Sequence, residues 1–60
     1  MNLKDCITKG KTLIEDYQWA MVSMDEKLMD KYCAEKTQLD IWVMNHLSED
    51  EACEYFRALD

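Results

Sequence analysis

The chain has 60 residues, enough for one small domain at most, and its apolar content of 48% is too high for a disordered chain. With no proline and one glycine, it has too few chain breakers for a β-rich fold with several turns. Its net charge of −6 does not supply the basic face that direct nucleic-acid binding requires.

A first helix is predicted over residues 3–21, with Asn2 as a weak N-terminal cap. Its apolar side chains recur at helical spacing and form one stripe, which Gly10 interrupts. A glycine inside a helix costs about 1 kcal/mol relative to alanine. Close approach of the second helix near Val43 would compensate for that cost, and a tolerated weak position is the alternative. Trp19 and Val22 fall outside the stripe.

Two S-x-x-E sequences predict where the next helices begin. They are Ser23 to Glu26 and Ser48 to Glu51, and each matches a capping box, in which the serine and the glutamate bond to each other's backbone N–H groups. We therefore predict helices over residues 24–46 and 49–59. Since the linkers are almost absent, neighbouring helices should be antiparallel.

The stretch LDIWVMNHL, residues 39–47, is apolar on two sides of the second predicted helix. In an up-down-up arrangement this segment would lie between the first and third helices, which would bury both sides. The sequence thus predicts an all-α fold, a small three-helix up-down bundle made of a long helical hairpin and a short C-terminal helix. Residues 1–60 would form this single helical domain, which a second copy could complete.

The third helix is too short to cover the whole hairpin, being about 17 Å long against about 35 Å for the second. Apolar and aromatic side chains near the first turn would then remain open, and such patches mark interaction sites. We expect a protein-binding or dimer surface there, made of Tyr17, Trp19, Met21, Met24, Leu28, Met29 and Tyr32. The alternative is that the first helix curls over and buries these side chains. Ile41 and Trp42 form a secondary candidate contact.

Cysteine and histidine provide little sign of chemistry. Cys6, Cys33 and Cys53 are odd in number and widely spaced, so we expect three buried thiols and no disulfide framework. His46 is expected near the last carbonyls of the second helix. A metal would have to combine it with Asp50 and Cys53, without the close ligand pairs of zinc sites, so no metal or cofactor is expected.

These patterns favour a protein that is not an enzyme and acts by binding another protein, since familiar catalytic motifs are absent. A signal peptide and a 20-residue apolar run are also missing, so we expect a cytoplasmic protein without membrane contact. We interpret the chain as a small acidic accessory or regulatory protein that forms a homodimer. An alternative is an acidic inhibitor that imitates nucleic acid, for which a bacteriophage origin would fit the size. A third hypothesis is a thiol or metal sensor using Cys33, Cys53 and His46.

Overall fold

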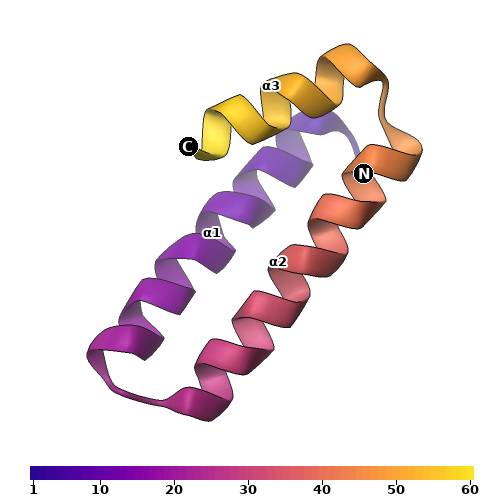
Figure 1. The fold of residues 1–60 in the computed structure, drawn as a ribbon. Helices are drawn as coiled ribbons and strands as arrows, with labels where there is room; N and C mark the ends of the chain where they lie inside the picture. Colours follow the sequence, from indigo (N-terminus) through magenta and orange to yellow (C-terminus); the bar gives the residue numbers. More distant parts are fainter.

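The computed structural model describes residues 1–60 and consists of three helices without strands. They are α1 (Leu3–Val22), α2 (Glu26–His46) and α3 (Glu49–Leu59). Helices α1 and α2 form an antiparallel hairpin, and α3 lies across the end that is remote from the α1–α2 turn (Figure 1). The predicted all-α three-helix bundle is confirmed, and each predicted helix boundary lies within two residues of the observed one.

The turn between α1 and α2 differs from the prediction. Ser23 does not cap α2 but ends α1, and the next two N–H groups, of Met24 and Asp25, donate to Met21 O and Ala20 O at 3.1 and 3.0 Å. This is a Schellman motif, a helix ending that usually has glycine where Met24 lies. Because the motif takes up Ser23 and Met24, α2 begins only after Asp25, whose carboxylate accepts from Leu28 N. The predicted capping box at Ser23 is therefore wrong.

The second capping box is present as predicted. Ser48 Oγ accepts from Glu51 N at 3.2 Å, and Glu51 Oε1 accepts from Ser48 N at 3.4 Å. Three acidic residues in the first turn of α3 also interact favourably with the positive end of its helix dipole. The short helix is thus fixed at its start, directly after α2 ends.

The core lies where α3 crosses the hairpin. Its buried side chains are Cys6, Leu13, Leu39, Val43 and Tyr55. Gly10 is buried against α3, where a Cβ atom on it would lie 2.7 Å from Leu59 Cδ1 and 3.3 Å from the Tyr55 hydroxyl. The glycine therefore allows close approach of a helix, as predicted, but that helix is α3 and not α2 near Val43. The short α3 supplies the neighbour because it lies directly over this turn of α1.

The segment 39–47 is buried on fewer sides than predicted. Leu39 and Val43 are buried, and Trp42 and Leu47 are half-buried, but Ile41 and Met44 are exposed. Helix α2 meets α1 and α3 on adjoining sides, so its outer side remains in solvent. The prediction that the bundle covers this segment on both apolar sides is wrong for Ile41 and Met44.

Candidate protein-binding surface

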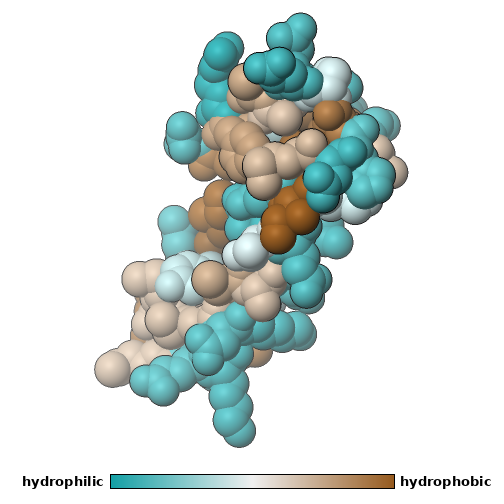
Figure 2. All heavy atoms as spheres, turned by 45° about the vertical axis from the view of Figure 1, so that its right-hand side comes forward, coloured by the Kyte–Doolittle hydropathy of each residue, from teal (hydrophilic) through white to brown (hydrophobic).

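Large apolar side chains gather at the end of the hairpin that α3 does not reach. We call this the hairpin-end surface, made of Tyr17, Trp19, Met21, Met24, Leu28, Met29 and Tyr32. Trp19 is 71% exposed and Met24 85% exposed, while Met21 and Leu28 are exposed to a smaller extent. Apolar side chains are visible over the lower end of the molecule in Figure 2. The molecule thus leaves apolar area in water where only two helices pack.

The remaining three members of the hairpin-end surface are half-buried. Tyr17, Met29 and Tyr32 each keep part of their side chain in solvent and bury the rest. Helix α1 does not curl over this end, because it ends at Val22 and the chain turns directly into α2. The sequence-predicted residues therefore lie at the same end of the hairpin, with Trp19 and Met21 on opposite sides of α1. That they bind a protein stays a prediction.

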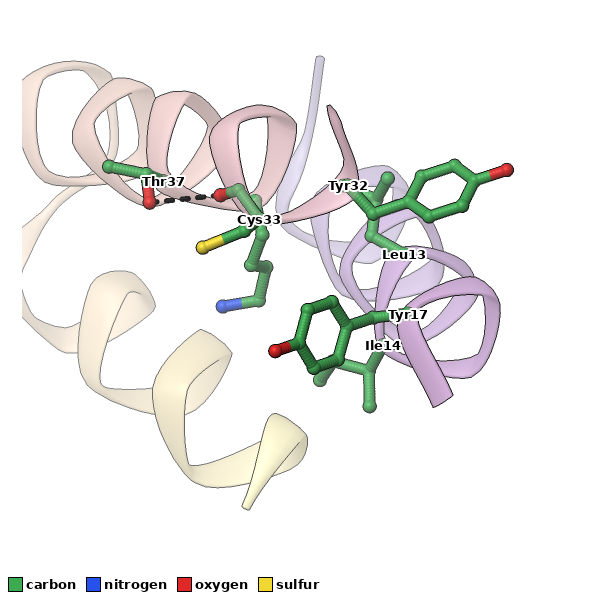
Figure 3. A pocket seen from close by; sticks show the side chains of 7 residues that line it. Leu13, Ile14, Tyr17, Tyr32, Cys33 and Thr37 are labelled. Carbon is green, nitrogen blue, oxygen red and sulfur yellow. Dashed lines mark hydrogen bonds between the residues drawn. The ribbon is translucent and has the colours of Figure 1, made fainter. Parts of the chain in front are cut away.

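A groove runs between α1 and α2 on the side where α3 lies. It has a volume of about 220 Å³, and its lining is Leu13, Ile14, Tyr17, Tyr32, Cys33, Lys36 and Thr37. Figure 3 shows the Tyr17 ring and the Cys33 thiol directed toward the open space, whereas the Tyr32 ring turns away from it. The groove is the uncovered continuation of the hairpin surface on which α3 packs.

A second hollow, here called the Trp19 hollow, has a similar volume of about 220 Å³. It is lined by Asp16, Trp19, Ala20, Ser23, Leu28 and Tyr32. Tyr32 lines both cavities. Lys31 Nζ lies 5.8 Å from the centroid of the Tyr32 ring. The hollow therefore combines apolar side chains with a carboxylate on its α1 wall and an ammonium group close to a residue of its α2 wall.

Met24 combines exposure with an unfavourable backbone conformation. Its φ of 56° lies in the left-handed region, which side chains with a Cβ atom adopt at a cost of about 1–2 kcal/mol. Glycine would remove that cost, and the Met24 side chain gains little burial in exchange. The fold alone gives no reason for methionine at the tip of the hairpin.

The secondary candidate residues lie apart from the hairpin end. Ile41 is exposed, whereas Trp42 is half-buried and stacks on His46 with ring centroids 4.4 Å apart. His46 Nδ1 lies 2.9 Å from Trp42 O, so the histidine is at the carbonyl end of α2 as predicted. This stacking uses part of the Trp42 surface within the chain.

A polar link between α2 and α3 was not anticipated from the sequence. The buried Tyr55 hydroxyl donates to Asp40 Oδ1 at 2.6 Å, and Lys36 Nζ donates to the same oxygen at 2.7 Å. Burial, followed by the hydrogen bond and the charge of Asp40, raises the pKa of Tyr55. Asp40 and Lys36 are one helical turn apart, and that spacing alone could have signalled their ion pair. The link fixes α3 on α2, and its Lys36 also lines the groove between α1 and α2.

The cysteines differ from one another. Cys6 is buried as predicted, but Cys33 and Cys53 are exposed thiols, so the expectation of three buried cysteines is wrong for two of them. Cys33 lines the groove on its α2 side. Cys53 lies on the exposed side of α3, which packs on the hairpin with one face only. No three histidine, cysteine, aspartate or glutamate side chains form a group that could hold a metal ion.

Comparisons with known proteins found no relative, since no family model, no curated protein and no solved structure matches the chain. None of the three helices combines the length and the apolar character needed to cross a membrane.

Proposed function

We propose that this chain is a small acidic accessory or regulatory protein of the cytoplasm that acts by binding another protein through the hairpin-end surface. The observation that carries the proposal is the concentration of exposed Trp19, Met21 and Met24 at the one end of the hairpin without a third helix. Tryptophan and methionine are enriched in the cores of protein interfaces. Three unpaired cysteines fit a reducing compartment.

The Met24 backbone supports the same proposal. A residue held in a costly conformation without a benefit to the fold is a reason to look for a role in function. Met24 places a flexible apolar side chain at the most exposed point of the hairpin. Such side chains adapt to the shape of a partner.

The experiment compares Met21→Asp with Met44→Asp in a quantitative binding measurement. Both methionines are half exposed, at 51% and 58%, and both lie in the last turn of a helix. The new carboxylate therefore meets the same end of a helix dipole in each variant. Immobilised wild-type chain is used to capture partners from cell extract, and the same captured protein is then titrated against both variants.

We expect Met21→Asp to weaken binding at least about tenfold, because an interface residue becomes a desolvated charge. Met44→Asp should bind as the wild type does. Equal binding by both variants, or equal loss in both, would contradict a role for the hairpin end.

A binding measurement at several salt concentrations separates this proposal from the acidic inhibitor. Association through apolar surface changes little between low and moderate salt, whereas association of 13 carboxylates with a basic groove weakens steeply. The thiol-sensor hypothesis predicts instead that oxidation of the exposed Cys33 and Cys53 changes binding.

A further inference from the structure

We infer that the partner of the Trp19 hollow is a second copy of this chain, so that two hairpin ends pack together as a homodimer. This inference rests on the proposed function because it names the occupant of the same surface. Three observations support it: the area of the molecule, the exposed Trp19 and Leu28 side chains that line the hollow, and the placement of opposite charges on its two walls.

The molecule exposes more surface than a compact chain of its size. Its accessible surface is 4566 Å², whereas a folded monomer of this mass has about 4,100 Å². Only 7 of 60 residues are buried. A second copy packed on the hairpin would remove this excess and enlarge the core.

The exposed apolar side chains of the Trp19 hollow are Trp19, which is 71% exposed, and Leu28, which is 37% exposed. Since a large side chain has on the order of 200 Å² of surface, these two present about 200 Å². A specific interface buries about 600–1,000 Å² on each partner, so the two apolar side chains form its centre and polar neighbours supply the rest of the contact.

Opposite charges flank the Trp19 hollow. Asp16 lines its α1 wall, and Lys31 lies beside the Tyr32 ring of its α2 wall. In a contact with two-fold symmetry each wall meets the opposite wall of the other copy when the axis runs parallel to the helices. The carboxylate of Asp16 would then face the ammonium group of Lys31 in the other copy, twice per dimer. The surface is thus complementary to itself although each chain carries a charge of −6.

The positions along the hairpin agree with this arrangement. Residues equally far from the turn lie at the same level in an antiparallel hairpin, which places Asp16 level with Lys31 and Trp19 level with Leu28. A two-fold axis parallel to the helices keeps these levels. Trp19 of one copy would therefore pack against Leu28 of the other, within a four-helix arrangement of two hairpins.

The test reverses each charge alone and then combines the two variants. Asp16→Lys brings like charges together in its own dimer, and so does Lys31→Asp. Mixed in equal amounts, the two variant chains again face each other with opposite charges in both contacts. Light scattering and analytical ultracentrifugation over a hundredfold concentration range, with reducing agent, measure the dimer dissociation constant of each sample.

We expect a wild-type dimer, weakening of roughly tenfold or more in each variant, and recovery of dimer in the mixture. Glu54→Lys and Lys4→Asp serve as controls, since they change the net charge equally at exposed positions near the other end of the molecule. Both should leave the dimer unchanged, and circular dichroism verifies that all four variants are folded.

Two outcomes would overturn the inference. A wild type that remains monomeric removes the second copy as the partner, while hairpin-dependent binding of a different protein would leave the proposed function intact. A dimer that tolerates both reversals, or that the mixture does not restore, would show that the copies associate with another geometry.

Discussion

The two halves of the α1–α2 hairpin contain similar apolar residues but differ in whether a third helix covers them. Where α3 crosses, Cys6, Val43 and Tyr55 have no exposed surface. At the hairpin end, Trp19 and Met24 are among the most exposed large apolar residues of the chain, and only the small Ala20 is buried. Coverage by α3 therefore adds to burial in one half, whereas large apolar side chains remain free for a partner in the other.

The halves also differ in how their helices are held together. The covered half has the one side-chain hydrogen bond that joins two helices, between Tyr55 and Asp40. A buried hydrogen bond to a charged group adds directional preference to apolar packing. At the hairpin end only two helices meet, no side-chain hydrogen bond joins them, and Tyr17, Met29 and Tyr32 are half-buried. Changes in the covered half should therefore act on stability, and changes at the hairpin end on binding.

The largest expected difference comes from removing one tyrosine ring in each half. Tyr55→Ala should cost about 3–5 kcal/mol, because it opens a cavity in the core and leaves Lys36 as the one remaining side-chain donor to Asp40. A 60-residue chain has a total stability of about 3–9 kcal/mol. Urea titration followed by far-ultraviolet circular dichroism should show a largely unfolded or strongly destabilised variant.

Tyr17→Ala is the matched change at the hairpin end. Its ring is half-buried and alanine favours the α1 helix, so we expect a loss of about 1 kcal/mol. If the two variants lost equal stability, the division of the hairpin into a stabilising half and a binding half would be wrong.

The sequence was sufficient to predict the elements and the uncovered end. Helical periodicity and the capping box at Ser48 predicted three helices. The predicted lengths then indicated that the third helix is too short to cover the whole hairpin. Trp19 lies outside the apolar stripe of α1 and Met24 lies in the turn beyond the reach of α3, so the exposure of both could be predicted from the sequence. These features depend on local patterns and on simple geometry.

The contacts between helices could not be predicted from the sequence. The partner of Gly10 depends on the crossing position of α3, which brings Leu59 and Tyr55 over it. The hydrogen bond between Tyr55 and Asp40 joins residues fifteen positions apart, and no periodicity predicts it. Ser23 matched a cap motif, but the end of α1 competed for the same residues and the Schellman motif formed. A local sequence pattern does not predict which helices come into contact, or which of two helix-end motifs forms where both could use the same residues.

A second difference between the halves should appear at alkaline pH. The pKa of Tyr55 is raised above its ordinary value of 10.0, first by burial and then by Asp40. The folded state therefore holds the phenol proton more tightly than the unfolded chain does. This stabilisation is complete below pH 10.0 and is lost as the pH rises toward the folded pKa. In that range, loss of the Tyr55 proton should lower the free energy of unfolding by about 1.4 kcal/mol for each unit of increase in pH.

Urea titrations below and above this pH measure the effect, with Tyr55→Phe as the control. The variant keeps the ring in the core and removes only the titrating hydroxyl. Its stability should fall less steeply with pH, because the Tyr55 hydroxyl is the one group in which the two proteins differ. Parallel curves would contradict a folding role for the Tyr55 proton.

The smallest expected change in stability is at the tip of the hairpin, where it should be opposite in sign to the change in binding. Met24→Gly relieves the left-handed conformation at φ 56° and should raise stability by about 1 kcal/mol, or the melting temperature by about 4–8 °C. Met24→Ala removes the same side chain and keeps the strained backbone. Glycine also gives the unfolded chain more freedom, which reduces the stability gain of Met24→Gly. Both variants should bind the partner more weakly, and to a similar extent, because both lack the methionine side chain. Calorimetry measures the change in stability, and the dimer dissociation constant measures the change in association.

A Met24→Gly chain that is more stable and associates more weakly would show that Met24 contributes to binding at a cost in stability. Unchanged association in both variants would remove Met24 from the binding surface.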